Sequence, residues 1–431
     1  MKNIVICCDG TGNEISENIS NVLKLYRCLR KTPKTTPHQM VFYDPGVGTL
    51  ERPDPWHKLV QDASAIFGLA TGYGLDDNLL AAYEFLVRNY EDGDDIFLFG
   101  FSRGAYTVRA LAGLIHKVGL VSPQQANLAG FGLTAYKQLS TGEPSVLALD
   151  PKTLTDAGDG DDGHDAVNKD DQAGQFARIL STRWPMIKFV GVWDTVASVI
   201  VPRPDRFYWP TLEELAFTRS NPSVKIFRQA MSIDERRRMF RLKPWQPDQT
   251  FMNRYSLTNA EPQDALQVWF AGVHADIGGG YPEIESGISK FPLIWMIDEA
   301  VAHGLAVDRQ TVNHLAWGIP RKGSPFSYVA PSIHSPPHNS LAPAWRPLEY
   351  IPKRDKYKEW KPRPSLLGHY IPDGEPRFIA EDAFVHESVV QRRDAEKDYR
   401  PINLPANPRI IPMPPGPVQQ ASGPEASGPA D

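Results

Sequence analysis

The fold is decided by the stretch Asp95-Ile96-Phe97-Leu98-Phe99-Gly100-Phe101-Ser102-Arg103-Gly104-Ala105-Tyr106. An apolar, strand-like run ends at the first glycine, and a helix-like run from Ala105 to Lys117 begins directly after the second. The pattern G-x-S-x-G between a strand and a helix is typical of a turn so tight that the serine is held in a strained backbone conformation. The stretch therefore predicts an α/β fold in which the hydroxyl of Ser102 is exposed above the sheet edge as a candidate nucleophile.

The neighbours of Ser102 have distinct roles in such a turn. Gly100 and Gly104 are required because a Cβ at either position would collide with the neighbouring strand or helix. The amide of Arg103 points toward the place where a tetrahedral oxyanion would form, at the positive end of the new helix. We therefore expect the backbone of Arg103 to contribute to an oxyanion hole.

Two later segments repeat the pattern of an apolar strand followed by a polar residue. The run Ile187–Trp193 is followed by Asp194, and the run Leu266–Val273 is followed by His274 and a glycine-rich loop. A serine nucleophile needs a histidine that takes its proton and a carboxylate that orients the histidine. In this architecture they follow in the order serine, acid, histidine. We predict that Ser102, Asp194 and His274 form a catalytic triad.

The N-terminal segment predicts a further part of the site. The run Ile4–Cys8 indicates a buried first strand, and Asp9–Asn13 the loop that leaves it. In folds of this type the second oxyanion-hole amide comes from a loop at the carboxyl edge of a strand near the nucleophile. We expect Gly10 or Thr11 to donate that amide, with Gly10 allowing close approach to the substrate.

Two other carboxylates lie near these motifs. Asp276 is the nearest rival to Asp194, but two residues from His274 it is poorly placed to reach the same imidazole. Asp9 has two interpretations that the sequence leaves open: it caps amides of its own turn, or it contacts the substrate. A strand ending in Asp-Gly-Thr also resembles the opening of haloacid-dehalogenase-type phosphatases, but Cys7 occupies the position of their nucleophilic aspartate.

Together, and in this order, the motifs resemble the α/β-hydrolase-like domain family that includes the catalytic domains of type VI secretion phospholipase effectors. The resemblance implies an α/β-hydrolase-like, mostly parallel sheet with helices on both faces and insertions at its carboxyl edge. It also implies ester hydrolysis, with phospholipids as substrates in the effector branch, and it places the family triad on Ser102, Asp194 and His274. The matching segments, which cover residues 1 to about 310, are Asp9–Asn13, Tyr43–Thr49, Gly93–Gly113, Gly191–Val196, Ser232–Arg238 and Val268–Tyr281.

Composition and charge fit such an enzyme and exclude other classes. Hydrophobic residues make up 41% of the 431-residue chain, enough to bury a large core. The net charge of −5 argues against a dedicated nucleic-acid binder, which carries a basic surface. Cys7, Cys8 and Cys28 are odd in number and lack metal-binding spacing, so neither a disulfide framework nor zinc is indicated. We expect no cofactor and no metal, and a small-molecule or lipid ester as the substrate.

The sequence predicts a protein made in the cytoplasm. Residues 1–3 lead directly into a short buried strand, with no cleavable secretory pattern. No later apolar run reaches the length that spans a membrane. Export by a machine that needs no leader would leave no trace in these patterns. Any contact with lipid is therefore expected to be peripheral.

Three parts are predicted along the chain. Residues 1–310 form the catalytic domain, with insertions at about 122–183 and 201–255. Residues 311–400 form an irregular C-terminal module packed on the core. Residues 401–431 are rich in proline and are expected to form an extended or disordered tail.

The first insertion contains an acidic, glycine-rich run at residues 156–165. The spacing of Asp159 and Asp161 is that of the first two ligands of a calcium loop. However, His164 stands where that loop requires glycine, and Asp170 stands where it requires a bidentate glutamate. A solvated, flexible loop is the favoured interpretation.

The second insertion brings aromatic and basic residues between the predicted acid and base. Trp209 and Trp245 are candidates for substrate binding through an apolar acyl chain, since the reacting ester needs a dry pocket. The competing interpretation is that these aromatics pack the insertion onto the core. The run Asp234–Arg238 is expected to be a helical face with mixed charges, forming an ion-pair network.

Strand and helix signals alternate around these motifs, as a layered α/β fold requires. We predict a helix over Asn21–Leu29, with Asn18 or Ser20 as its cap, and a strand over Gln39–Tyr43. An amphipathic helix is predicted over Leu75–Tyr90. Near the C-terminus, residues 384–393 indicate a short helix.

Two functions of different classes remain. The first is a serine hydrolase that cleaves carboxylic esters through an acyl-enzyme, with lipids or other apolar acyl esters as substrates. The second is a non-catalytic binding or scaffolding protein that has kept the fold. A triad with both elbow glycines favours the hydrolase, since relaxed selection loses such special positions first.

Overall fold

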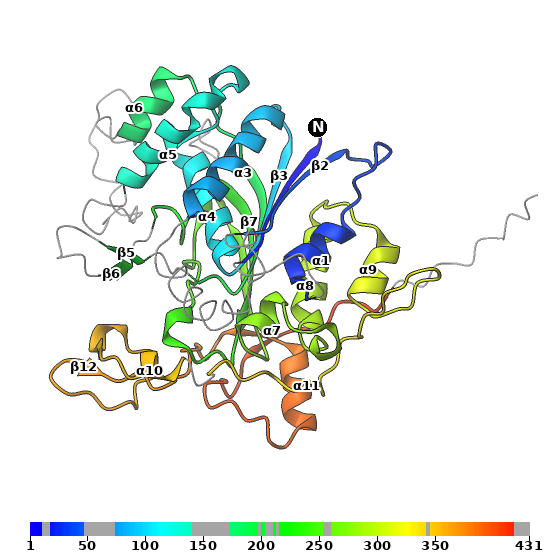
Figure 1. Ribbon diagram of the computed structural model, residues 1–431, viewed down its shortest axis with the longest axis vertical. Coiled ribbons are helices and arrows are strands. Elements are labelled where there is room, and N and C mark those ends of the chain that lie inside the picture. The colour runs from blue at the N-terminus through cyan, green and yellow to red at the C-terminus, as the bar shows by residue number, and fades with distance from the viewer. Residues whose placement is uncertain are drawn as a thin grey trace, which may run out of the picture.

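In the part of the chain that the structure describes, eight parallel strands form one central sheet of this computed structural model (Figure 1). The described residues are 1–10, 18–46, 74–139, 172–196, 200–202, 210–212, 215–252, 260–341 and 345–417. The order of strands across the sheet is β14-β13-β10-β7-β4-β3-β1-β2. Their bounds are β1 Asn3–Cys8, β2 Gln39–Asp44, β3 Asp95–Phe101, β4 Ile187–Trp193, β7 Val224–Ser232, β10 Asp264–Phe270, β13 Phe384–His386 and β14 Arg409–Ile411.

The strands are apolar on both faces because helices cover both (Figure 1). In β1, Ile4 and Ile6 pack in one cluster with α3, α4 and α5, whereas Val5 and Cys7 pack in another with α1, α8 and α9. Such double burial is typical of parallel sheets, and it confirms the predicted fold class. The bounds of these helices are α1 Asn21–Cys28, α3 Leu75–Asn89, α4 Arg103–Val118, α5 Ala129–Gln138, α8 Lys290–Ala302 and α9 Arg309–Leu315.

The first elements lie where the sequence predicts them. Helix α1 follows Ser20, whose Oγ accepts a hydrogen bond from the amide of Leu23 at 3.0 Å, so Ser20 rather than Asn18 is the cap. Strand β2 and helix α3 each agree with their predicted range to within one residue.

The carboxyl ends of the central strands lie at one edge of the sheet, in register. Phe101 at the end of β3 pairs with Trp193 at the end of β4, and Trp193 pairs with Ala230 in β7. Phe270 at the end of β10 pairs with Ser232 at the end of β7. The segments that leave these strands therefore converge at this edge, where open α/β sheets bind their ligands.

The predicted insertion at 201–255 contains a central strand and is to that extent wrong. Val224–Ser232 forms β7, between β4 and β10. Its polar residues hide the strand in the sequence, because Arg228 and Gln229 interrupt the apolar run. Arg228 is tolerated in the sheet since its guanidinium pairs with Asp264 at 2.8 Å and with Glu299 at 2.6 Å.

Two short strands near the C-terminus also differ from the prediction. Phe384–His386 forms β13, which pairs with β10, and only Glu387–Ala395 forms the helix, α11. Arg409–Ile411 forms β14, which pairs with β13, in the region expected to be an extended tail. Strands of three residues are too short to give a periodic signal. Residues 418–431 lie outside the described part of the chain.

Residues 345–378, which we call the lobe, project from the body of the molecule (Figure 1). The lobe contains α10 and an antiparallel hairpin of β11 and β12. The remaining elements are α6 Gln172–Ile179, α7 His274–Gly278, α10 Arg346–Glu349, β5 Ile200–Pro202, β6 Pro210–Leu212, β8 Thr250–Phe251, β9 Glu261–Pro262, β11 Lys353–Arg354 and β12 His369–Tyr370, with 3₁₀ turns η1 Pro123–Leu128, η4 Arg238–Phe240, η5 Glu283–Glu285 and η6 Asp355–Tyr357.

None of the described helices has the length and apolar character needed to cross a bilayer. The thiols of Cys7, Cys8 and Cys28 are all buried and unpaired by disulfides. The acidic run at residues 156–165 lies outside the described residues.

Candidate active site

Ser102 lies in a strained turn directly after β3. Its φ of 55° and ψ of −119° are rare for a residue with a Cβ. The turn is tight because its glycines face backbone atoms. A Cβ on Gly100 would lie 2.4 Å from the carbonyl oxygen of Gly104, and a Cβ on Gly104 would lie 2.1 Å from the carbonyl oxygen of Cys8. Since α4 begins at Arg103, the serine is held between strand and helix, as predicted from the sequence. Ser102 is only 6% exposed, however, so the predicted exposure of the hydroxyl is wrong.

Three side chains from distant segments form a continuous chain of hydrogen bonds. Oγ of Ser102 lies 2.8 Å from Nε2 of His274, and Nδ1 of His274 lies 2.6 Å from Oδ2 of Asp194. All three side chains are buried. A proton on Nδ1, donated to the carboxylate, leaves Nε2 free to accept the serine proton. The structure thus brings together the three residues selected from the sequence, in the order that proton transfer requires.

The carboxylate of Asp194 is fully buried and accepts hydrogen bonds on both oxygens. Oδ1 accepts the amide of Ser232 at 2.9 Å and Nη1 of Arg377 at 2.6 Å. Oδ2 accepts Nη2 of Arg377 at 2.9 Å, in addition to the imidazole. Burial raises the pKa of Asp194, but the charge of Arg377 and the hydrogen bond from His274 outweigh it and hold that pKa below its usual value. Asp194 is therefore ionised at neutral pH.

Arg377 is the residue of the site that sequence reasoning missed. It lies 183 residues after Asp194 and is 1% exposed. It stands in a proline-rich stretch without strand or helix periodicity, so no local pattern marks it. A buried arginine of this kind can be found only once the fold brings it to its carboxylate.

The imidazole of His274 is enclosed by aromatic rings and charges. The rings of Phe101 and Phe240 lie with their centroids 4.7 and 4.8 Å from its own. Burial lowers the pKa of His274 and outweighs the opposing effect of Asp194, so the net pKa lies below the ordinary 6.5. The imidazole is therefore neutral at pH 7, the state in which it can accept a proton.

Glu235 is a second buried acid beside the histidine. Its Oε2 accepts the backbone amide of His274 at 3.2 Å, and its Oε1 accepts the hydroxyl of Ser340 at 2.9 Å. Arg237 donates to both oxygens at 2.9 Å. Burial raises the pKa of Glu235, but Arg237 lowers it, to about 2. The predicted helix over Asp234–Arg238 is wrong, because Asp234–Arg237 are irregular and only Arg238 begins the 3₁₀ turn η4. The expected ion pairing is present between Arg237 and Glu235.

The three candidate oxyanion donors, the amides of Arg103, Gly10 and Thr11, differ in their surroundings. The amide of Arg103 is the first of α4, at the positive end of the helix. The end of β1 and the residue that follows it pack on the elbow, since Gly104 approaches the carbonyl oxygens of Cys8 and Asp9. The amide of Gly10 donates to Oδ1 of Asp9 at 2.7 Å. Thr11 lies outside the described residues.

Asp9 is 2% exposed and is engaged by its own surroundings. Besides the amide of Gly10, its carboxylate accepts the hydroxyl of Ser20 and, at 2.9 Å, the hydroxyl of Tyr43. These contacts favour the interpretation in which Asp9 fixes the turn after β1 and links it to α1 and β2.

Asp276, the rival acid, is also engaged elsewhere. Its Oδ2 accepts the amide of Val273 at 2.9 Å, and its Oδ1 accepts Nδ1 of His338 at 2.6 Å. Nε2 of His338 in turn lies 3.0 Å from Glu285. Asp276 therefore fixes the first turn of α7, whereas Asp194 contacts the imidazole of His274.

The structure places Trp245 in the core rather than at an open surface. Its side chain is 3% exposed and stacks on Phe227, with ring centroids 4.1 Å apart and an interplanar angle of 13°. Its Nε1 donates to Gln263 at 2.6 Å. These contacts favour the core-packing interpretation over the substrate contact. Trp209 lies outside the described residues.

A small, mostly buried apolar cluster borders the histidine. Phe240 contacts the imidazole edge-on, and its ring centroid lies 5.6 Å from that of Trp345, at the base of the lobe. Val196 and Met239 belong to the same cluster. These four residues, which we call the apolar wall, come from the segments after β4 and β7 and from the lobe.

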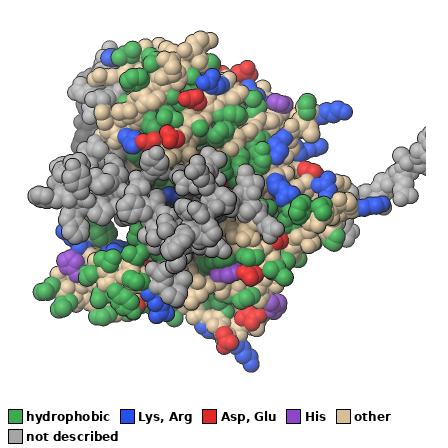
Figure 2. Space-filling view, viewed as in Figure 1, with side chains coloured by type: hydrophobic (Ala, Val, Ile, Leu, Met, Phe, Trp, Pro, Cys, Tyr) green, Lys and Arg blue, Asp and Glu red, His purple; other side chains and the backbone are tan. Residues whose placement is uncertain are grey.

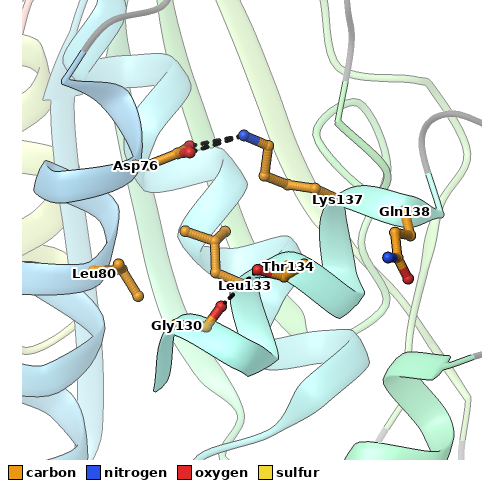
Figure 3. A pocket seen from close by; sticks show the side chains of 7 residues that line it. All are labelled: Asp76, Leu80, Gly130, Leu133, Thr134, Lys137 and Gln138. Atoms are coloured by element: carbon orange, nitrogen blue, oxygen red, sulfur yellow. Dashed lines mark hydrogen bonds and ion pairs between the residues drawn. The ribbon is translucent and has the colours of Figure 1, made fainter. Parts of the chain in front are cut away.

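A pocket of about 330 Å³ lies between α3 and α5, away from these residues (Figure 3). Lys137 and Asp76 form an ion pair across it at 2.8 Å. No triad residue lines this pocket. Among the described residues, no group of three His, Cys, Asp or Glu side chains is arranged to hold a metal ion.

Comparisons with known proteins point to one family. The profile described as "T6SS, Phospholipase effector Tle1-like, catalytic domain" matches residues 2–299. The chain is also 30% identical over 264 residues to the uncharacterized protein YEL023C of Saccharomyces cerevisiae. That match covers 60% of this chain and 34% of the yeast protein, so the chain spans about a third of this relative.

Two solved structures are similar at lower identity. An uncharacterized protein from Pseudomonas aeruginosa is 18% identical with a TM-score of 0.36, over 71% of this chain and 46% of that one. The Tle1 effector, solved bound to the VgrG spike from the Type 6 secretion system, is 17% identical with a TM-score of 0.33. The latter match covers 66% of this chain and 52% of the effector.

Proposed function

Because the chain belongs to the family of Tle1-like catalytic domains of type VI secretion phospholipase effectors, we propose that it is a serine hydrolase of carboxylic esters. The observation that carries the proposal is the chain of hydrogen bonds from Ser102 through His274 to Asp194, at 2.8 and 2.6 Å. The ionised acid and the neutral imidazole are the protonation states that a resting triad needs. We further propose that the substrates are lipid esters or other esters with apolar acyl groups.

The reaction begins when Oγ of Ser102 attacks the ester carbonyl while His274 takes the hydroxyl proton on Nε2. Asp194 stabilises the resulting imidazolium through Nδ1. The tetrahedral oxyanion collapses, the bond to the leaving alcohol breaks, and the imidazolium gives that alcohol its proton. The acyl-enzyme is then hydrolysed by water, which His274 deprotonates in the same way. Both steps restore the starting protonation state.

The oxyanion is stabilised first by the amide of Arg103, at the positive end of α4. The segment that follows β1 is the proposed source of a second donor, since Asp9, its first residue, lies directly against the elbow. Thr11 remains a candidate. Gly10 can serve only if its amide leaves the carboxylate of Asp9, to which it donates at 2.7 Å.

Several observations support a lipid substrate. The apolar wall borders the imidazole and continues into the lobe through Trp345. On the lobe, Leu366 and Leu367 are 77% and 91% exposed. Apolar and basic side chains gather there (Figure 2). Residues 345–378 contain eight Lys or Arg and five Asp or Glu; without the buried Arg377, Glu349 and Glu375, seven basic and three acidic residues remain, a net charge of +4 within a chain of −5. Exposed apolar side chains beside basic ones suit peripheral contact with anionic lipid.

A non-catalytic scaffold fits these observations less well. The backbone of Ser102 is held in a conformation that costs about 1–3 kcal/mol. A binding protein gains nothing from that strain, whereas a nucleophile gains the placement of its hydroxyl at the helix terminus, within hydrogen-bond distance of His274.

The test is hydrolysis of a panel of acyl esters of rising chain length and of phospholipids, by wild type, Ser102→Ala and Ser223→Ala. Ser223 is a matched control because its hydroxyl also lies 2.7 Å from an imidazole nitrogen, that of His116, at the opposite edge of the sheet. We expect Ser102→Ala to lose about 10³–10⁶ in kcat. We expect Ser223→Ala to retain activity. Equal turnover by wild type and Ser102→Ala, with unchanged melting, would refute the serine mechanism.

A further inference from the structure

Arg377 forms a two-point ion pair with the proposed catalytic acid. Its Nη1 lies 2.6 Å from Oδ1 of Asp194 and its Nη2 lies 2.9 Å from Oδ2. The same nitrogens donate to the carbonyl oxygens of Ser232 at 3.1 Å and Phe240 at 2.6 Å. A planar guanidinium that matches a carboxylate in this way fixes the rotation of the carboxylate as well as its position.

We propose that Arg377 is a positioning residue for the reaction, and that the chain beyond residue 299, where the family match ends, is a required part of the active site. The inference rests on the proposed function. Arg377 turns the carboxylate of Asp194 so that Oδ2 faces Nδ1 of His274, and it offsets the negative charge of that carboxylate.

The orientation of Asp194 depends on few other groups. Asp194 follows β4 with a φ of 38°, so its side chain leaves the strand at an unusual angle. Among the described residues, the remaining hydrogen bonds to its carboxylate come from the amide of Ser232 on Oδ1 and from His274 on Oδ2. A carboxylate held by one donor on each oxygen can rotate. Rotation would break the hydrogen bond from Nδ1 of His274. The proton would then no longer be held on Nδ1, and Nε2 would not be kept free to accept the proton of Ser102.

The charge of Arg377 also affects the histidine. The acids Asp194 and Glu235 and the cation Arg237 act directly on its imidazole. Arg377 acts through the two acids, because its charge lowers the pKa of both Asp194 and Glu235. Loss of Arg377 leaves one uncompensated negative charge in this buried cluster, which favours the imidazolium. A protonated imidazole cannot accept the serine proton. Arg377 therefore keeps the base neutral to a lower pH.

Contacts to the segment after β7 hold the backbone around Arg377 in place. The side-chain amide of Asn403 donates to the carbonyl oxygens of Arg377 at 3.0 Å and Ile233 at 3.1 Å. Glu375 pairs with Arg241 at 2.7 Å. Both contacts join residues around Arg377 to the segment that leaves β7. The guanidinium is thus held from the strand beside the one that carries Asp194.

The experiment compares Arg377→Met and Arg377→Lys with wild type. The control is Arg228→Met, which removes another buried arginine that makes two nitrogen–oxygen contacts to an aspartate, here the half-exposed Asp264, at 2.8 and 2.9 Å. That pair lies away from the triad, at the start of β10. For each protein, kcat/KM is measured against pH on a soluble ester. The protonation of His274 is followed by histidine-labelled NMR, assigned with His274→Gln, in the absence of substrate.

We expect Arg377→Met to lower kcat by about 10- to 100-fold, as happens when the hydrogen-bond partner that orients a metal ligand is removed. We also expect the acidic limb of its kcat/KM–pH profile, and the midpoint of the NMR titration of His274, to move to higher pH. Arg377→Lys keeps the charge but cannot bind both oxygens, so its acidic limb should stay in place while kcat falls. Arg228→Met should lower the melting temperature without moving the limb.

Unchanged kcat in Arg377→Lys, or an unchanged His274 titration in a folded Arg377→Met, would overturn the inference. So would an equal shift of the limb in Arg228→Met. The NMR titration of His274 does not depend on turnover. If hydrolysis proved independent of Ser102, the proposed function would be refuted, but the titration would still show whether Arg377 affects His274.

Discussion

Replacing Gly104 by alanine should damage both the stability and the activity of the protein. The added Cβ would lie 2.1 Å from the carbonyl oxygen of Cys8 and 2.5 Å from that of Asp9. Both neighbours are backbone atoms, so no side chain can move aside. To reach even 3.0 Å, the closest separation that real Cβ atoms show, the elbow and the end of β1 must part by about 0.9 Å.

The size of both effects follows from that displacement. Overpacking of a tight interior typically costs about 1–3 kcal/mol of unfolding free energy. A shift of about 1 Å in the catalytic geometry costs about 100-fold in rate. The displacement moves the elbow relative to the loop after β1, the proposed source of a second oxyanion donor. We therefore expect Gly104→Ala to lose about 1–3 kcal/mol in stability and about 100-fold in kcat/KM.

The assays are urea unfolding followed by tryptophan fluorescence, and hydrolysis of a soluble chromogenic ester. Gly130→Ala is the matched control, because Gly130 is an exposed residue of α5 whose added Cβ would meet nothing within 4 Å. It should be neutral, or more stable by about 0.5–1 kcal/mol, as expected for alanine in a helix. If Gly104→Ala unfolds at the wild-type urea concentration and retains wild-type kcat/KM, the elbow is not the tight junction described above.

Three further predictions concern the base, the core and the lobe. Since the pKa of His274 is lowered and only the neutral imidazole accepts a proton, kcat/KM should be level at neutral pH and fall on acidification with an inflection below pH 6.5; an inflection above pH 7 would contradict the buried neutral base. Trp245→Ala should lose about 3–5 kcal/mol of stability and slow short and long esters equally; a selective loss on long esters would restore the substrate-contact interpretation. Leu366→Asp combined with Leu367→Asp should reduce turnover on anionic phospholipid vesicles but spare a soluble short-chain ester. Ile179→Asp, at a similarly exposed residue of α6, should change neither activity. If the double leucine variant and Ile179→Asp hydrolysed the vesicles equally fast, the lobe would be excluded as a lipid contact.

The parts of the site that could be predicted from sequence are those carried by local patterns. The elbow at Ser102 combines an apolar strand, two glycines and a helix within a dozen residues. Asp194 and His274 each follow an apolar run. A parallel sheet brings the carboxyl ends of its strands to one edge, so the three positions converge without knowledge of the loops. The helices and strands near the N-terminus were likewise predictable from periodicity and a serine cap.

The parts that could not be predicted depend on contacts between distant segments. Arg377 has no local signal, and its role follows from a carboxylate 183 residues earlier in the chain. Strand β7 is obscured by Arg228, whose charge is neutralised by residues of later elements. Glu235 lies in a charged run typical of an exposed helix, yet it is buried because Arg237, Ser340 and the amide of His274 satisfy its oxygens. The burial of Trp245 could not be predicted either, because its stacking partner Phe227 lies in strand β7, which the sequence does not reveal.

The most direct test of the central claim is the site of covalent labelling by a fluorophosphonate. The folded protein is treated with the probe at neutral pH, and the adduct is located by intact mass and peptide mapping, in wild type, Ser102→Ala, His274→Ala and the control Ser223→Ala. An activated Ser102 predicts one adduct on the peptide that contains it, absent in Ser102→Ala, greatly slowed in His274→Ala and unchanged in Ser223→Ala. An adduct on another residue, or a labelling rate that does not depend on His274, would contradict the claim that Ser102, His274 and Asp194 act as a triad.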